Sequence, residues 1–450
     1  MALTVQTDVS GNVIYPSYNP IRFGVESSST SEDNYKTIVY IHRDPSGDDE
    51  KVAELRYDIR PSTNAVLVDV SKITQSFVST DIANVVAETV GGATESSDYE
   101  EWKVAFQEYF GTIPAATGSV VSGTTFYTCN GAFRFEEWKD YNYYASEGNW
   151  VVLADDTAAS IVSSNIWMHD WGNVHTTSTG ATGLEASSLT RDLNWLPIQA
   201  GQYLPLRWRK SDYTEGGIYI NLYDENFSLN HQDGVDWTNA PSEYCVRSMN
   251  VGTDELNATG GLSFTVNTDD KYMTVCWYDP DDSGGGAAIR RGSNFLLYEI
   301  DHTPCDTYTN YEILWLNRLG GIDSYVFTGR PYKNYEWENS RYMRNTVSIN
   351  TDGSTITDNL HARKMGTDST RTKRKYKVNS QIIPAWMAEG FADLFSSPMV
   401  WWRRTTETSN QLIQIVPQGS MYEVKNSVGD KAFNIELDFV IDSKDQRQRG

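Results

Sequence analysis

Short runs of β-branched and aromatic residues, separated by clusters of turn-forming residues, recur along almost the whole chain and favour a fold made mainly of strands. The runs YKTIVYIH, VAELRYDI and AVLVDV follow one another near the amino terminus, with turn clusters such as DPSGDDE between them. Strands at this spacing are typical of small antiparallel β-sandwiches. Similar runs resume further along at YLPLRWR, GIYINLY, YMTVCWY and NFLLYEI. The sequence therefore predicts a mainly β protein.

Chain length sets the number of domains. At 450 residues the chain is too long for one hydrophobic core, since cores stop growing at roughly 250–300 residues. An acidic segment containing Gly and Ser, from Val90 to Glu101, is typical of a linker. We expect two amino-terminal antiparallel β-sandwich-like domains and a carboxy-terminal α+β domain. Their expected ranges are 1–90, 91–300 with a loop-rich insertion at about 141–188, and 301–450.

The last domain carries the clearest helix pattern in the chain, AWMAEGFADLFSSP. Ser380 is a candidate helix cap, Pro384 suits the first turn, and Pro398 ends the pattern. Strand-like runs stand on both sides, so we expect a β-sandwich with one amphipathic helix. The apolar stripe of that helix is Met387, Phe391, Leu394 and Phe395.

Charge divides the chain near residue 310. Residues 1–310 hold 18 Lys and Arg against 44 Asp and Glu, a net −26, whereas residues 311–450 hold 19 against 16, a net +3. The strongly acidic part would repel nucleic acid and anionic membranes, so we expect neither as a partner. There is also no run of 18 apolar residues, so the sequence predicts no membrane-spanning helix.

Basic and aromatic residues gather in the less acidic part and favour a protein interface. A basic strip docks on an acidic neighbour and sets its register, and Trp and Arg are the usual anchors of interface centres. Because Trp401 and Trp402 are adjacent, a strand would point them in opposite directions, and we expect at least one to lie outside the domain's own core. The predicted interface residues are Arg371, Lys373, Arg374, Lys375, Lys377, Trp386, Trp401, Trp402, Arg403 and Arg404.

No catalytic pattern is present. GxSxG, HExxH, Walker and GxGxxG motifs are missing, and adjacent acids such as Glu100 and Glu101 would point to opposite faces of a strand. We expect no enzymatic activity, no catalytic residue and no cofactor. A glycan-cleaving enzyme stays a third alternative, which would require two carboxylates about 5–10 Å apart in a cleft.

Metal sites are also not expected. Asp279, Asp281 and Asp282 precede three glycines, which leaves calcium binding open, but the twelve-residue loop with its closing Glu is missing. We interpret His169 and His175 as polar loop residues, and the four cysteines as small buried hydrophobic residues.

One sequence segment resembles a known protein family. The run from Asn294 through Cys305 to Phe327, which contains LNRLGG, resembles uncharacterised virion structural proteins of tailed bacteriophages, particularly those of Bacteroidetes and aquatic bacteria. NPIRFGVESS is similar to the opening β domain of that family, LTRDLNWLP to its middle, and AWMAEGFADLFSSPMVWW to its ending. In outline, the ending is also similar to the ring-forming folds of tail-tube and distal-tail proteins.

The resemblance implies a non-enzymatic structural subunit of a phage tail or baseplate, assembled in the host cytoplasm. Residues from about 301 onward would join a homo-oligomeric ring, a hexamer or another cyclic ring, and would contact other tail or baseplate proteins. The acidic β domains would face outward. As an alternative, outer loops with Trp167 and Trp171 would bind host-surface glycan, which would make the chain a receptor-recognition virion protein.

Overall fold

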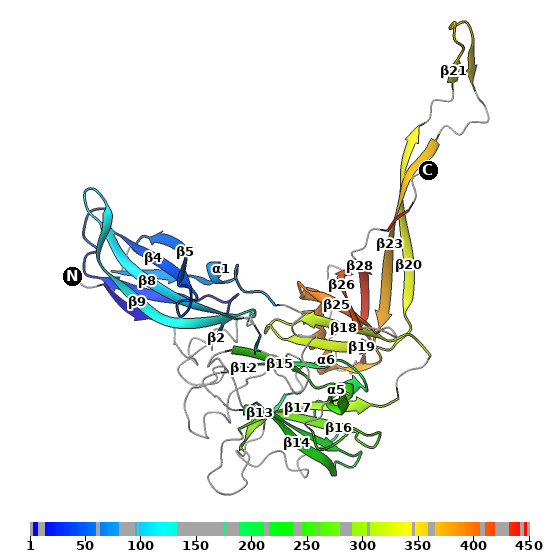
Figure 1. The fold of residues 1–450 in the computed structure, drawn as a ribbon, viewed down its shortest axis with the longest axis horizontal. Helices are drawn as coiled ribbons and strands as arrows, with labels where there is room; N and C mark the ends of the chain where they lie inside the picture. The colour runs from blue at the N-terminus through cyan, green and yellow to red at the C-terminus, as the bar shows by residue number, and fades with distance from the viewer. Residues whose placement is uncertain are drawn as a thin grey trace. The chain divides into compact units, whose positions relative to one another are not determined.

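The computed structural model describes the chain in segments, and strands predominate in them (Figure 1). The mainly β class expected from the sequence is confirmed, and most strand pairs are antiparallel. Among the described residues, α6 (Ala385–Ser396) is the longest helix, beside the short α1 (Ser71–Thr74) and α5 (Thr253–Ala258). The described residues are 3–7, 14–59, 64–80, 95–96, 99–132, 169, 171, 174–176, 189–210, 216–237, 245–258, 262–279, 290–303, 307–343, 347–358, 365–405, 410–418, 432–441 and 445–447.

The chain divides into two compact units. The first comprises Met1–Pro304 together with Trp315–Ser324, and the second comprises Cys305–Leu314 together with Tyr325–Gly450. The division at Pro304 lies close to the boundary expected at residue 300. That Trp315–Ser324 belongs to the first unit was not expected from the sequence.

The first unit begins with two sheets that share one core. Along β3 the side chains alternate, and Phe23 points inward, with ring centroids 5.7 Å from Phe106 and 5.9 Å from Phe126. Burial of one face explains the period-two pattern of these strands. The three-stranded sheet contains β1 (Leu3–Thr7), β3 (Arg22–Ser27) and β6 (Ala65–Asp69). The five-stranded sheet contains β2 (Ile14–Pro16), β9 (Ala115–Cys129), β8 (Tyr99–Phe110), β4 (Lys36–Arg43) and β5 (Glu50–Tyr57).

The expected boundary at residue 90 is therefore wrong. β8 pairs with β4 along its length, with Phe106 opposite Val39, so residues 99–129 belong to the first sandwich. An acidic, Gly-containing segment was interpreted as a linker, but such a composition suits a long connection inside one domain equally well.

Two further sheets form the rest of the first unit. The three-stranded sheet has the order β12-β15-β7, and β17 lies between β10 and β16 in the six-stranded sheet. The strands of the smaller sheet are β12 (Pro205–Lys210), β15 (Cys245–Asn250) and β7 (Glu95–Ser96). Those of the larger sheet are β10 (Val174–Thr176), β11 (Leu196–Gln199), β13 (Gly216–Tyr223), β14 (Leu229–Trp237), β16 (Tyr272–Asp279) and β17 (Arg290–Asp301).

The second unit is built on an eight-stranded sheet with the order β19-β18-β25-β26-β28-β23-β20 and with β29 paired to β23. β18 and β19 form a hairpin whose tip, Trp315–Ser324, belongs to the first unit. The strands are β18 (Tyr311–Leu316), β19 (Ile322–Phe327), β20 (Tyr332–Met343), β23 (Met365–Asn379), β25 (Val400–Thr405), β26 (Asn410–Gln418), β28 (Glu436–Ile441) and β29 (Asp445–Arg447). Small pairs are formed by β21 (Val347–Ile349) with β22 (Ile356–Asp358), and by β24 (Ile383–Pro384) with β27 (Ala432–Phe433).

The amphipathic helix lies where the sequence predicts it. Met387, Phe391 and Leu394 are fully buried, so most of the predicted stripe is confirmed. Phe391 packs edge-on against Tyr325, with ring centroids 4.9 Å apart. The predicted cap is wrong: the cap position is Pro384, and the Ser380 hydroxyl instead accepts a hydrogen bond from the Ile435 N–H at 2.8 Å.

Burial under α6 has a consequence for alkaline stability. It raises the pKa of Tyr325 well above its ordinary value of 10.0. Above about pH 10 the unfolded chain releases this proton while the folded chain keeps it, so the free energy of unfolding falls as the pH rises. We expect Tyr325→Phe to remove this loss.

Urea unfolding of both proteins between about pH 9 and pH 11 measures the effect. The stability advantage of the wild type over Tyr325→Phe should shrink by up to about 1.4 kcal/mol per pH unit. An advantage that stays constant over this range contradicts the prediction.

Candidate functional site

The predicted basic strip lies on β23, and part of its charge is neutralised within the second unit. Lys375 pairs with Glu336 at 2.6 Å and Lys377 with Glu436 at 2.5 Å, across to the neighbouring strands. Lys373 is exposed and Arg374 is half-buried. The backbone of Arg371 pairs with Glu338, whereas its side chain lies outside the described residues. A patch of unpaired positive charge is therefore smaller than the sequence indicates.

The two adjacent tryptophans belong to the interior. Trp401 is 4% exposed and Trp402 is 8% exposed, so the expectation that one of them leaves the core is wrong. Both faces of β25 are covered. The Trp402 ring lies 5.0 Å from Tyr311 and 5.6 Å from Tyr376, within an aromatic cluster of the second unit. Trp386, on α6, is half-buried.

Arg403 and Arg404 have opposite environments. Arg403 Nη1 donates a 2.6 Å hydrogen bond to Glu312 Oε2, and both side chains are largely buried, so Arg403 is an internal partner and not a surface anchor. Arg404 is exposed, and its guanidinium lies 5.9 Å from the centre of the Trp402 ring.

The pair predicts contrasting effects of the same substitution. Arg403→Ala leaves the buried Glu312 carboxylate without this partner and should lower the stability of the second unit by about 3 kcal/mol. Arg404→Ala should cost less than about 1 kcal/mol, because an exposed cation over a ring contributes little. Chemical unfolding monitored by limited proteolysis measures the free energy of unfolding of both variants. Equal losses of stability would contradict the different environments assigned to Arg403 and Arg404.

A surface that the sequence reasoning missed is the long hairpin of β20 and β23. Every residue of β20 is exposed. Among the described residues β20 pairs only with β23, and the two strands form the long ribbon seen in Figure 1. We call residues 332–379 the arm. Trp337 is 68% exposed and Tyr335 47%, and their two-residue spacing places them on the same face. The alternation of aromatic and polar or charged residues in YKNYEWE is a sequence pattern that predicts this strand.

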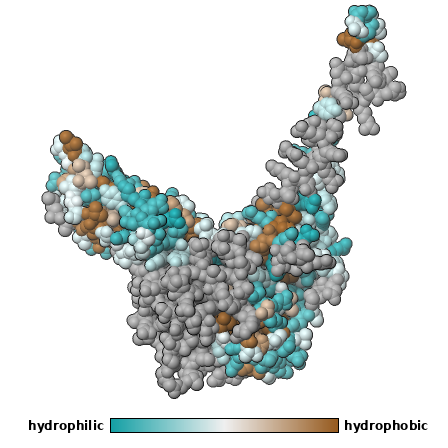
Figure 2. All heavy atoms as spheres, viewed as in Figure 1, coloured by the Kyte–Doolittle hydropathy of each residue, from teal (hydrophilic) through white to brown (hydrophobic). Residues whose placement is uncertain are grey.

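Apolar side chains continue along the arm in cross-strand pairs. Met343 lies opposite Met365, at 84% and 56% exposure, and Ile349 lies opposite Ile356 in the small β21–β22 hairpin. Figure 2 shows hydrophobic residues at the far end of this ribbon. Cross-strand apolar pairs of this kind usually pack against a covering layer, yet these pairs face solvent in the single chain.

The resemblance phrase LNRLGG forms the buried tip of the β18–β19 hairpin. Asn317 closes it: its Oδ1 accepts hydrogen bonds from the N–H groups of Leu319 and Gly321, at 3.0 and 2.9 Å. Its Nδ2 donates to Asp323 Oδ2 at 3.0 Å. Leu319 enters the core of the first sandwich. Gly131 fits this approach, because a Cβ there would lie 2.9 Å from the Leu319 carbonyl oxygen.

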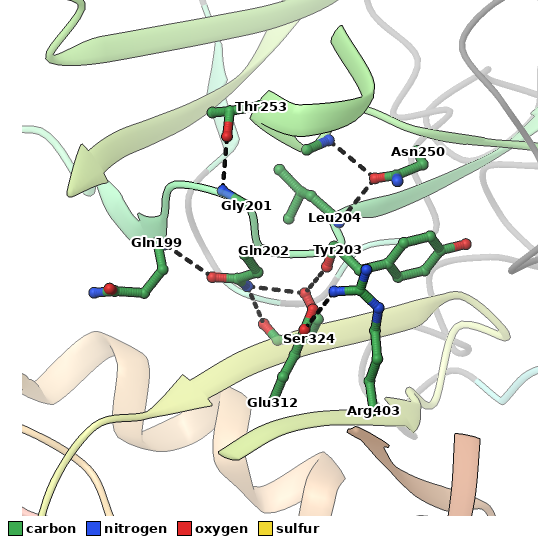
Figure 3. Close-up of polar contacts among 11 residues, drawn as sticks. Gln199, Gly201, Gln202, Tyr203, Leu204, Asn250, Thr253, Glu312, Ser324 and Arg403 are labelled. Carbon is green, nitrogen blue, oxygen red and sulfur yellow. Dashed lines mark hydrogen bonds and ion pairs between the residues drawn. The ribbon is translucent and has the colours of Figure 1, made fainter. Parts of the chain in front are cut away.

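Polar residues of the first unit hold the same tip. Gln202 Nε2 donates to Ser324 Oγ at 3.0 Å, and Ser324 Oγ donates to the Tyr203 carbonyl at 2.8 Å (Figure 3). Arg207 donates to the Gly320 carbonyl at 2.8 Å. His169 Nδ1 lies 2.7 Å from Asp323 Oδ1; this histidine stands outside helices and strands, as interpreted, but it is buried, with 5% exposure. These residues act in packing the tip. His175, by contrast, belongs to β10 and not to a loop.

Asn317 is expected to matter more than an asparagine in an exposed turn. Asn317→Ala leaves two buried N–H groups and a carboxylate oxygen without this partner, which should cost about 2–4 kcal/mol. Asn350 is the matched control, since its Oδ1 accepts from Thr355 N–H in the exposed β21–β22 turn. Its alanine variant should lose less than about 1 kcal/mol, as measured by calorimetry. A small loss for Asn317→Ala contradicts the role assigned to it.

Of the remaining candidate residues, Trp171 is buried and the others, or their side chains, lie outside the described residues. Trp171 is 1% exposed and packs edge-on against Trp315 at 5.4 Å, so it cannot stack on a glycan, while Trp167 lies outside the described residues. Asp279 ends β16, and Asp281 and Asp282 are also outside. In the described segments no three His, Cys, Asp or Glu side chains gather as metal ligands.

Two further observations complete the description of the candidate residues. Cys129 and Cys276 are buried, as predicted, whereas the side chains of Cys245 and Cys305 lie outside the described residues. None of the helices in the described segments is both long and apolar enough to cross a bilayer.

No family model matches the chain, and no curated protein matches it.

Proposed function

We propose that the chain is a non-enzymatic structural subunit of a phage tail or baseplate, which assembles through its carboxy-terminal part into a homo-oligomeric ring in the virion. The exposed arm is the observation that carries the assembly role. The phage setting rests on the resemblance of the LNRLGG region and of the chain's ending. In this proposal the subunit forms in the host cytoplasm and meets other tail or baseplate proteins.

The arm is poorly suited to remain alone in water. A two-stranded ribbon without a covering layer is marginally stable, and an edge strand presents unpaired N–H and C=O groups. Trp337, Tyr335 and Met343 would each contribute about 1.5–3 kcal/mol on full burial. A partner that covers one face therefore stabilises the arm and gains affinity from residue types typical of interface centres.

Charge favours assembly between copies. The arm holds ten Lys and Arg against five Asp and Glu, a net +5, whereas residues 1–310 carry −26. Opposite net charges steer encounter and orientation more than they add affinity. Head-to-tail contacts of this kind generate closed rings when the rotation between copies closes.

A shortened arm tests the assembly role. Glu336 lies opposite Lys373, so an Asn-Gly turn can join these two residues in place of 337–372. The full chain should form rings visible by electron microscopy, and the shortened chain should sediment as a folded monomer with nearly unchanged thermal unfolding. Deleting everything after residue 300 is a poorer test, because it also removes the hairpin tip from the first unit.

Two results would overturn the proposal. One is a full chain that remains monomeric at high concentration, and the other is a shortened chain that assembles as well as the wild type. Gln381→Ala, an exposed substitution in the same unit but outside the arm and outside the predicted interface residues, serves as the control and should assemble normally.

A further inference from the structure

The β8–β9 hairpin of the first unit carries the longest charge-free stretch of the sequence, between Glu108 and Arg134. We call residues 109–132 the neutral hairpin. Its turn residue Ile113 is 89% exposed, and Val120 on β9 is 51% exposed. Apart from β8, the described residues pair with β9 only at Tyr127–Cys129, through β2. An uncharged, exposed strand of this kind is unusual, since soluble proteins generally protect such strands with charge.

Small side chains dominate this surface. The segment AATGSVVSG from Ala115 to Gly123 contains no residue larger than Val. The register with β8 shifts between Phe106 and Glu108, and Gly118 has a positive φ of 78°. Glycines on an exposed strand leave backbone uncovered, and a large aromatic ring from a neighbouring strand covers such positions well.

We infer that the arm of one copy docks its Tyr335 and Trp337 face on the neutral hairpin of a second copy. This inference rests on the proposed assembly role. The arm supplies large exposed aromatic rings, and the neutral hairpin supplies small residues that accommodate them. Residues 109–132 carry no charged side chain that the rings would desolvate, and the neighbouring Glu108 is already buried and accepts a hydrogen bond from the Ser27 hydroxyl. The rest of the acidic region carries many charges whose desolvation is costly.

Electrostatics and symmetry point to the same partner. The arm is net positive, and residues 1–132, which include the neutral hairpin, hold 8 Lys and Arg against 18 Asp and Glu, a net −10, so attraction guides the two surfaces together before apolar contact forms. Each copy carries one arm and one neutral hairpin, so the contact is heterologous and repeats from copy to copy.

A photo-crosslinking amino acid in place of Trp337 locates the partner surface directly. Copies with this substitution are mixed with wild-type copies labelled with heavy isotopes, irradiated, digested and analysed by mass spectrometry. Cross-links to residues 109–132 of heavy copies are the expected result. Cross-links elsewhere on the heavy copies, or only within light chains, would overturn the inference.

Charge insertion gives an independent measurement. Ile113→Lys and Val120→Lys should each raise the dissociation constant for self-association about tenfold or more, because a lysine ammonium would have to be desolvated. Leu67→Lys is the matched control: Leu67 is 38% exposed on β6 of the same sandwich. It should leave self-association unchanged, and equal effects of all three substitutions would contradict the docking surface.

The two proposals fail differently. If shortening the arm abolishes assembly but the lysine variants assemble normally and cross-links lie elsewhere, the arm has another partner surface and only the docking inference falls. If shortening the arm has no effect, the proposed assembly role itself falls.

Discussion

The buried side chain of Asn317 is the interaction on which the tip of the β18–β19 hairpin depends. It satisfies two N–H groups of its own turn and the carboxylate of Asp323, so a polar hairpin tip can be buried without unpaired backbone groups there. Because the tip belongs to the first unit while its strands begin and end in the second, one hairpin contributes to both units. In the eight-stranded sheet, β19 is an edge strand and all of its residues are buried.

The two edges of that sheet differ in burial. Every residue of β19 is buried, whereas every residue of β20 is exposed, although both strands are rich in residues that favour sheets. A buried edge cannot accept another chain, so growth of this sheet in an assembly is possible only at β20 or along the arm. Because β19 is buried, β20 of one copy cannot pair with β19 of the next. In an assembly, β20 therefore needs a partner surface elsewhere in the chain.

Local patterns predicted local structure well. The stripe of α6 could be predicted because Met387, Phe391 and Leu394 repeat with the period of a helix, whatever surrounds them. The membership of β8 in the first sandwich could not, because it depends on pairing between residues about 65 positions apart, such as Val39 and Phe106. Sequence spacing contains no signal for such a pairing.

Errors about the candidate site have the same origin. Trp401 and Trp402 were expected to divide between core and surface, but a strand covered on both faces buries both. Lys375 and Lys377 read as free positive charge, yet Glu336 and Glu436 stand beside them on strands distant in sequence. In each case the neighbouring strand, which the sequence does not specify, decided the environment.

Large exposed apolar residues are found on the arm and on the neutral hairpin. The paired lysines of β23 sit where the arm joins the sheet, and the exposed Met343, Ile349 and Ile356 lie further along it. In the first unit, carboxylates surround the neutral hairpin in sequence but are missing from it. Exposed apolar surface is costly in water and is generally limited to sites of contact. The neutral hairpin carries no charged side chain, and the arm exposes large apolar residues among its charges, which favours a contact made after folding.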